Sequence, residues 1–247
     1  MVDQNTNTRV ALVMGGSGGI GRAIVNEFFT KGYKIAVHYS SHKNSADELV
    51  QSINNQGGEA ILVGGDVADE KEMNAVFNEV ISRFGGIDVV VNTAGIMKLS
   101  PLVNLDLDEF DMIQRINVRG TFVVSQQAAL KVRPGGAIIN FSTSVTRTSF
   151  PNYSAYVASK AAVESLTLIL ARELRGKDIT VNTVAPGPTG TPLFFEGKEE
   201  AEIKQLAQAT PLERIGTPDD IAETVTFLAG PARWVNGQII FTNGGLI

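Results

Sequence analysis

The feature that most constrains the fold of this chain is a regular alternation of short β-branched runs with longer amphipathic runs. The short runs predict strands at Arg9–Met14, Lys34–Tyr39, Ala60–Val63, Ile87–Asn92, Ala137–Phe141, Ile179–Val184 and Gln238–Thr242. The amphipathic runs predict helices at Gly19–Lys31, Asn44–Asn55, from Asp69 onward, Leu107–Lys131, Tyr153–Arg175 and Pro218–Ala229. Strands that alternate with helices in this way pair in parallel, because each crossover helix returns the chain to the same end of the sheet.

The strand runs are apolar throughout, which is typical of a parallel sheet covered by helices on both faces. We therefore predict an α/β fold, with one doubly wound domain over residues 1–247 and a parallel, seven-stranded sheet. Asp69 and Glu72 predict a capping-box-like pair at the start of the third helix. Residues 186–211 lack a periodic pattern and form a long stretch for a compact fold, so we predict a substrate-binding loop there.

Composition and charge argue against several classes of function. Of the 247 residues 43% are hydrophobic, enough for a substantial core, and a net charge of −5 disfavours nucleic-acid binding. No run approaches the roughly 18 apolar residues of a membrane span. Cysteine is absent and only two histidines occur, His38 and His42, so we predict no metal site. The polar stretch Met1–Arg9 lacks a signal-peptide core, so we expect a cytoplasmic protein.

A glycine-rich segment, Gly15–Gly21, joins the first predicted strand to the first predicted helix. Glycines let the backbone turn sharply and approach a pyrophosphate, to which the helix N-terminus then offers free N–H groups. No Lys-Ser or Lys-Thr follows the glycines, so a P-loop is disfavoured. The segment predicts a dinucleotide-binding turn, with a plain strand-to-helix turn as the alternative.

The end of the second predicted strand indicates which dinucleotide would bind. An acidic residue at this point usually bonds the ribose 2′-hydroxyl of NAD, and none is present here. The segment instead carries Tyr39, Ser40, Ser41 and Lys43, with His42 between them, and hydroxyls and a cation can hold a 2′-phosphate. We therefore predict NADP(H) rather than NAD(H); the alternative is a polar loop that contacts no cofactor.

Tyr156 and Lys160 lie four residues apart in a predicted helix, which places both side chains on one helix face. An ammonium near a phenol favours the phenolate and lowers the tyrosine pKa, so the pair is suited to proton transfer. Alone the pair is weak, because tyrosine and lysine at this spacing also occur on ordinary solvated helix faces.

Four motifs together resemble the short-chain dehydrogenase/reductase family over nearly the whole chain. They are Gly15–Gly21, Asn92-Thr93-Ala94-Gly95, Tyr156–Lys160 and Pro186-Gly187, in the order and spacing of that family. The resemblance is strongest to ketoacyl-carrier-protein reductases and polyhydroxynaphthalene reductases, through Tyr39-Ser40-Ser41 and Asn117-Val118-Arg119-Gly120. It implies a Rossmann fold and hydride transfer between a nicotinamide and a carbonyl or secondary alcohol.

The resemblance also implies which residues bind the cofactor. Those implied to line the phosphates are Gly15, Ser17, Gly19, Ile20 and Gly21. Asp66 and Val67 would contact the adenine, and Asn92, Ala94 and Gly95 the adenosine ribose side. Those implied to hold the nicotinamide carboxamide and the nearby phosphate are Pro186, Gly187, Thr189 and Thr191.

The catalytic roles follow from the same resemblance. Tyr156 would be the general acid in reduction, and Lys160 would hold the nicotinamide ribose and lower the tyrosine pKa. Asn117 would carry a proton relay through water to Lys160. The family's catalytic serine falls at Thr143, although a shift of one residue would place Ser142 there. Both residues keep the hydroxyl that the chemistry needs, and we predict Thr143, with Ser142 as the alternative.

The substrate side is expected to be apolar, which suits an aliphatic or aromatic carbonyl: a ketone, a quinone-like compound or a 3-oxoacyl group. The predicted pocket residues are Met97, Ser144, Phe150, Tyr153, Leu193 and Phe194. The resemblance further implies a homotetramer.

Two other functions compete with reduction. One is a catalytically weak NADP-binding sensor or regulator on the same fold. The other is a sugar epimerase or dehydratase, which usually carries a substrate domain for which this chain is too short.

Overall fold

A computed structural model describes residues 8–247, so most of the N-terminal stretch Met1–Arg9 lies outside the described residues. The strands are β1 (Val10–Met14), β2 (Lys34–Tyr39), β3 (Ala60–Gly64), β4 (Ile87–Asn92), β5 (Val132–Phe141), β6 (Thr180–Pro186) and β7 (Ile239–Thr242). The helices before β5 are α1 (Gly19–Thr30), α2 (Lys43–Asn55), α3 (Glu70–Phe84), η1 (Leu102–Asn104), α4 (Leu107–Ile113), η2 (Gln114–Arg119) and α5 (Gly120–Lys131). Those after it are α6 (Val145–Thr148), α7 (Ser154–Glu173), α8 (Pro192–Phe195), α9 (Glu200–Gln208) and α10 (Pro218–Ala229).

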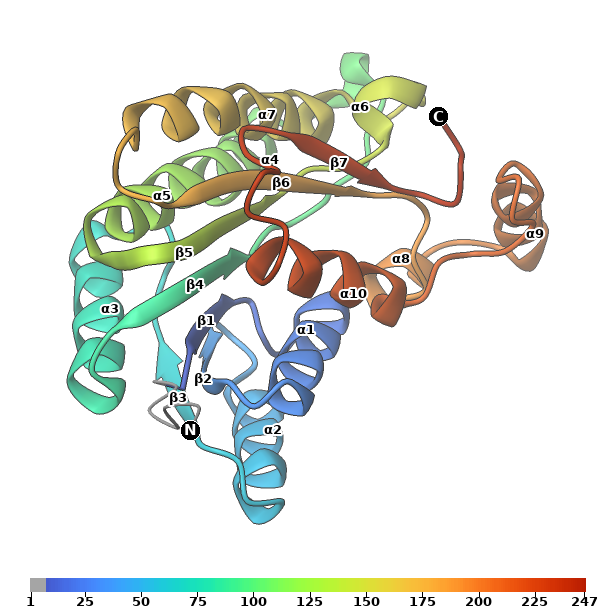
Figure 1. Cartoon of the computed structure of the whole chain (residues 1–247). Coiled ribbons are helices and arrows are strands. Elements are labelled where there is room, and N and C mark those ends of the chain that lie inside the picture. The colour runs from blue at the N-terminus through green and yellow to red at the C-terminus, as the bar shows by residue number, and fades with distance from the viewer. Residues whose placement is uncertain (1–7) are drawn as a thin grey trace.

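The strands form one sheet in the order β3-β2-β1-β4-β5-β6-β7, and every neighbouring pair is parallel. Helices α1, α2 and α10 cover one face, and α3, α5 and α7 cover the other (Figure 1). Within β1, Ala11 and Val13 join the first core cluster, while Val10, Leu12 and Met14 join the second. Both faces of the strand are therefore buried, and the predicted seven-stranded parallel sheet is confirmed.

Three local predictions differ from the structure. The predicted helix Leu107–Lys131 continues through its whole length but contains a π-helical turn, η2. Strand β5 begins at Val132 instead of Ala137. Residues Pro134-Gly135-Gly136 lie within the strand, at an irregularity where its pairing with β4 shifts register. The stretch 186–211 is not continuously irregular, since it contains α8 and α9, and α9 projects from the body in Figure 1.

The predicted capping-box-like pair at α3 is confirmed for Asp69 and wrong for Glu72. The Asp69 carboxylate accepts hydrogen bonds from the backbone N–H groups of Lys71 and Glu72, so the predicted N-cap is confirmed. The Glu72 carboxylate, however, accepts from the backbone N–H of Asp66. It therefore fixes the turn after β3 instead of the Asp69 backbone.

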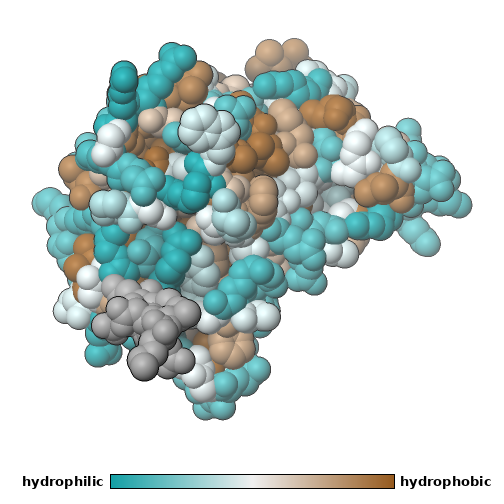
Figure 2. Space-filling model, viewed as in Figure 1, coloured by the Kyte–Doolittle hydropathy of each residue, from teal (hydrophilic) through white to brown (hydrophobic). Residues whose placement is uncertain are grey.

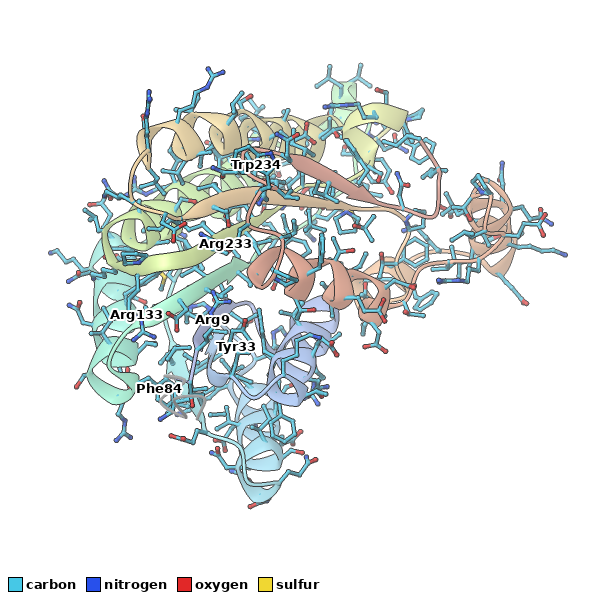
Figure 3. All side chains as sticks on the ribbon, viewed as in Figure 1. Arg9, Tyr33, Phe84, Arg133, Arg233 and Trp234 are labelled. Carbon is cyan, nitrogen blue, oxygen red and sulfur yellow. The ribbon has the colours of Figure 1, made fainter. Side chains whose placement is uncertain are left out.

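The end of the sheet from which the strands start is closed by arginines, which lie close together in Figure 3. Arg9 donates to the Tyr33 hydroxyl (3.1 Å) and to the Ala229 carbonyl (2.7 Å). Arg133 pairs with Asp88, and Arg233 donates to the Gly136 carbonyl. These contacts join segments far apart in sequence, and they leave the carboxyl ends of the strands free to form a site.

Among the described residues, no helix combines the length and the apolar character that crossing a membrane requires.

Candidate active site

A large cavity, about 1400 Å³ in volume, lies at the carboxyl ends of the strands. It is lined by the segments that follow β1, β2, β3, β4, β5 and β6, by α7 and by Leu246. Ligands of open α/β sheets bind at this end of the strands. The cavity therefore occupies the position at which a dinucleotide would be expected.

The glycine turn begins at the end of β1 and forms one wall of the cavity. Gly15 has φ of +70°, a conformation that side chains other than glycine rarely adopt. A Cβ on Gly21 would collide with the Gly15 carbonyl, and one on Gly19 would lie 2.8 Å from the Thr191 methyl carbon. Helix α1 starts here without a side-chain cap, so its first N–H groups are free to meet an anion.

Most of the predicted cofactor-binding residues line this cavity. They are Gly15, Ser17, Gly19, Ile20, Gly21, Ser40, Ser41, Asp66, Val67, Ala94, Gly95, Tyr156, Lys160, Pro186, Gly187, Thr189 and Thr191. Three others do not line it. The Tyr39 ring packs over Gly64, Asn92 is buried with its amide on the Thr121 hydroxyl, and Lys43 is exposed at the start of α2.

His38 also lines the cavity, although the sequence motifs do not predict it there. It lies inside an apolar strand, where the pattern predicts a core residue. The imidazole is 1% exposed, with Nε2 3.0 Å from the Gly65 carbonyl and Nδ1 accepting a long hydrogen bond from the Gly15 N–H (3.4 Å). This pattern requires the neutral tautomer with its proton on Nε2. His38 thus connects the glycine turn to the turn after β3.

Burial is the main influence on His38 and lowers its pKa from 6.5 to about 4. The unfolded chain then binds more protons than the folded chain between these values, so the stability is present above pH 6.5 and lost as the pH falls towards 4. Replacing His38 with glutamine should remove this pH dependence of the free energy of unfolding, which amounts to about 3 kcal/mol in total. Urea unfolding of both proteins from pH 4.5 to 7 measures it, with exposed His42→Gln as control. Parallel slopes for wild type and His38→Gln would contradict the assignment.

Arg115, also absent from the predicted site, pairs with Asp66 at the cavity wall (2.6 Å). Arg115 lies in η2 and Asp66 in the turn after β3. Despite some burial, the hydrogen bond from Arg115 helps to hold the Asp66 pKa below its usual value. The pair fixes the wall that the resemblance assigns to the adenine.

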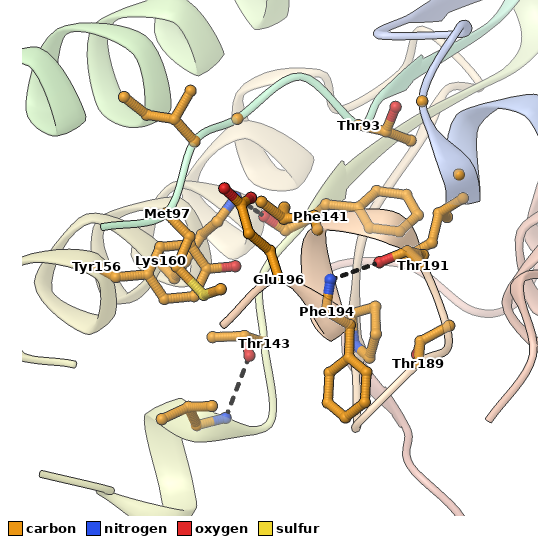
Figure 4. A pocket seen from close by; sticks show the side chains of 18 of the residues that line it. Thr93, Met97, Phe141, Thr143, Tyr156, Lys160, Thr189, Thr191, Phe194 and Glu196 are labelled. Atoms are coloured by element: carbon orange, nitrogen blue, oxygen red, sulfur yellow. Dashed lines mark hydrogen bonds between the residues drawn. The ribbon is translucent and has the colours of Figure 1, made fainter. Parts of the chain in front are cut away.

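Tyr156 and Lys160 lie together in the cavity on the first turns of α7 (Figure 4). The Lys160 ammonium is 5.7 Å from the centre of the Tyr156 ring and donates to the Phe141 carbonyl (3.0 Å). Burial raises the pKa of Tyr156 to about 12 and lowers that of Lys160 to about 8. The expected net lowering of the tyrosine pKa is therefore wrong for this structure, because desolvation of the phenol is the largest influence on it. The phenol keeps its proton at neutral pH.

The two candidate hydroxyls face different partners. Ser142 donates to the buried Glu164 carboxylate at 2.6 Å, which occupies its hydrogen. Thr143 accepts from the Val145 N–H (3.3 Å), so its own hydrogen remains free to donate. The Thr143 hydroxyl is also the group that acts to lower the pKa of Tyr156. The geometry favours Thr143 as the hydroxyl beside the phenol.

Asn117 is fully buried in η2 and does not line the cavity. Its amide donates to the Ile96 carbonyl (2.9 Å) and the Ser159 hydroxyl (3.0 Å), and its carbonyl oxygen accepts from the Ile96 N–H (2.9 Å). These bonds fix the segment after β4 against α7. The Asn117 side chain therefore has a structural role in holding these two segments together, and the proton relay stays a prediction.

Comparison with known proteins identifies the family. A family model described as enoyl-(acyl carrier protein) reductase matches residues 15–247. A short-chain type dehydrogenase/reductase of Picea abies is 43% identical, covering 97% of this chain and 92% of its own length. The chain belongs to the short-chain dehydrogenase/reductase family. The 3-oxoacyl-(acyl-carrier-protein) reductase FabG of Staphylococcus aureus strain Mu50 is 40% identical, over 97% of this chain and 98% of its own.

A solved structure agrees with this assignment. The short-chain dehydrogenase of Burkholderia cenocepacia J2315, in complex with NADP, superposes with a TM-score of 0.91 at 35% identity. The match covers 98% of this chain and 99% of the other. The predicted family and fold are both confirmed, and the chain is an oxidoreductase of the short-chain dehydrogenase/reductase family.

The part of the cavity beside Tyr156 in this short-chain dehydrogenase/reductase has an aromatic wall. The ring centres of Phe150 and Tyr153 are 6.2 Å apart, and those of Tyr153 and Tyr156 are 6.4 Å apart. All the predicted pocket residues line the cavity, namely Met97, Ser144, Phe150, Tyr153, Leu193 and Phe194. Ser144 is 1% exposed and accepts a hydrogen bond from Asn243, so it contributes little surface.

Charged residues also reach the cavity from the segment around α8 and α9. Glu196, Lys198 and Glu202 line it, and the Lys198 ammonium lies 5.0 Å from the centre of the Phe194 ring. Residues 196–202 are rich in glutamate, and α9 begins within this acidic run, at Glu200. The surface of the projecting α9 region is mostly hydrophilic in Figure 2.

Proposed function

We propose that this protein reduces a carbonyl compound with NADPH, or oxidises the corresponding secondary alcohol with NADP. One observation carries the proposal: the glycine turn and Tyr156, Lys160 and Thr143 line the same cavity. Phosphate-binding backbone and a proton donor therefore face one space, as hydride transfer with coupled protonation requires.

The residues present fit a dinucleotide. Neighbouring atoms lie so close to Gly19 and Gly21 that a Cβ at either position would collide with them. At the end of β2 the cavity is lined by Ser40, Ser41 and His42, without an acidic residue. This supports NADP(H), as does the NADP in the Burkholderia structure. Lys43 is the weaker candidate for the 2′-phosphate, since it does not line the cavity.

The protein's own residues supply the remaining chemistry. NADPH, when bound, supplies the hydride that adds to the carbonyl carbon. The Thr143 hydroxyl donates a hydrogen bond to the carbonyl oxygen and orients it. The Tyr156 phenol transfers its proton to that oxygen, giving the alcohol. The Lys160 ammonium then stabilises the resulting phenolate through its positive charge. The raised tyrosine pKa keeps the acid protonated at neutral pH, which suits reduction.

The proposed substrate is an uncharged ketone, a quinone-like compound or a 3-oxoacyl group. The aromatic wall and Met97 and Leu193 support a mainly apolar substrate. The similarity to a 3-oxoacyl-(acyl-carrier-protein) reductase supports the last of these classes.

Oxidation of NADPH with a panel of ketones, quinones and 3-oxoacyl thioesters tests the function. We expect turnover with kcat/KM for NADPH at least about 10-fold above that for NADH, the ratio that one or two charge-assisted contacts give. Faster oxidation of NADH throughout would overturn the cofactor proposal. Tight NADPH binding without turnover on any carbonyl would instead support the sensor function.

We also propose a homotetramer in the cytoplasm. Apolar side chains exposed on α4, α5 and α7 support the assembly: Met112, Phe122, Leu168 and Ile169. Light scattering should give a mass close to four chains, and a monomer mass at working concentration would overturn it.

A further inference from the structure

A buried carboxylate outside the cavity joins the two segments that carry the proposed catalytic groups. Glu164 lies on α7, one helical turn after Lys160 and two after Tyr156, and is 8% exposed. It does not line the cavity. A carboxylate at such a position is costly unless its oxygens are paired, so its partners indicate what it does.

All the partners of the Glu164 carboxylate come from the segment after β5. Ser142 Oγ donates to Oε1 (2.6 Å), Thr146 Oγ1 lies 2.8 Å from the same oxygen, and Arg147 pairs with Oε2 (3.1 Å). These three residues flank Thr143 on both sides. The Arg147 guanidinium is itself held over the Phe241 ring, 5.4 Å from its centre.

A further bond extends the same connection towards the phenol. Lys160 donates to the carbonyl of Phe141, the residue before Ser142. Residues 141–147 are therefore tied to two successive turns of α7, by Lys160 and by Glu164. The separation between the Thr143 hydroxyl and the Tyr156 phenol depends on these ties, since the two groups stand on different elements.

We propose that Glu164 is a positioning residue, which fixes Thr143 relative to Tyr156 by holding Ser142, Thr146 and Arg147 against α7. The inference rests on the proposed function, because Thr143 is assigned there as the hydroxyl that orients the substrate. Glu164 touches neither substrate nor cofactor, so it acts on turnover only through the position of Thr143.

A double-mutant cycle tests this dependence. Glu164→Ala should lower kcat by about 10-fold in the wild-type background, the scale of a modest misplacement of a reacting group. In the Thr143→Val background the same substitution should cost less than about 2-fold, since the hydroxyl it positions is absent. The Kd for NADPH, followed by its fluorescence, should stay unchanged. Equal losses in both backgrounds, or no loss in either, would overturn the proposal.

Two further variants separate positioning from folding. Glu164→Gln keeps an acceptor oxygen for Ser142, so it should retain more activity than Glu164→Ala and serves if the alanine variant does not fold. Glu173→Gln, exposed at the end of the same helix, is the matched control and should behave as wild type.

Amide hydrogen exchange gives a readout that needs no turnover. Exchange over residues 142–149 should be faster in Glu164→Gln than in wild type, and unchanged exchange would overturn the proposal. A wild-type protein that oxidises no NADPH with any carbonyl would overturn the proposed function alone, because exchange would still report on the Glu164 contacts.

Discussion

Replacing Tyr156 with phenylalanine is expected to lower kcat by about 1000-fold, within the range that loss of a general acid produces. The ring remains, so packing against Tyr153 and the shape of the cavity are kept. Only the proton that the carbonyl oxygen needs is removed. Steady-state NADPH oxidation with the best carbonyl measures the loss, and NADPH fluorescence should show that the cofactor still binds.

Tyr33→Phe is the control for this experiment. It removes a phenolic hydroxyl at the opposite end of the sheet, where Tyr33 accepts from Arg9, and Tyr33 does not line the cavity. Turnover should therefore remain at the wild-type level. If Tyr156→Phe retains most of the wild-type activity, the assignment of the proton donor is wrong.

Replacing Thr143 with valine should have the second largest effect, a fall in kcat of about 100-fold, as expected when one donor to a developing oxyanion is lost. Valine matches the shape of threonine but has no hydroxyl to donate. Thr143→Ser keeps the hydroxyl and should recover most of the activity. Single-turnover rates with saturating NADPH would measure the chemical step directly.

The parallel experiment at Ser142 separates the two hydroxyls. Ser142→Ala breaks a bond to Glu164 and should cost about 1 kcal/mol of stability, the usual value of a buried hydrogen bond, with a smaller loss of turnover than Thr143→Val. If Ser142→Ala proves the more damaging to kcat and Thr143→Val keeps full turnover, the two roles are exchanged.

The sequence was sufficient to predict the sheet, because parallel strands and crossover helices leave strong periodic patterns. The seven strands and the covering of both faces are confirmed. Local details depended on contacts that periodicity does not encode. Residues Pro134-Gly135-Gly136 look like a helix stop in the sequence, yet they lie inside β5, because the pairing with β4 resumes after a register shift.

The positions of the candidate site residues could be predicted from motif spacing. Their burial and their pKa values could not, because these depend on the residues packed around them. The glycine turn, Tyr156 and Lys160 line one cavity, as motif spacing predicts. His38 was missed because its neighbours make it look like a core residue. The predicted direction of the Tyr156 pKa shift was wrong, because the sequence shows a lysine at the right spacing but does not show that the phenol is buried.

The all-parallel sheet sets a condition on how this protein acquires its activity. The interior strand β1 pairs with β2 and with β4, and within residues 8–247 no two neighbouring strands are joined as a hairpin. Its contacts therefore close long loops, a topology that slows folding. The cavity lining includes both Gly15 and Leu246, so a chain emerging from the ribosome cannot complete the site until Leu246 has emerged.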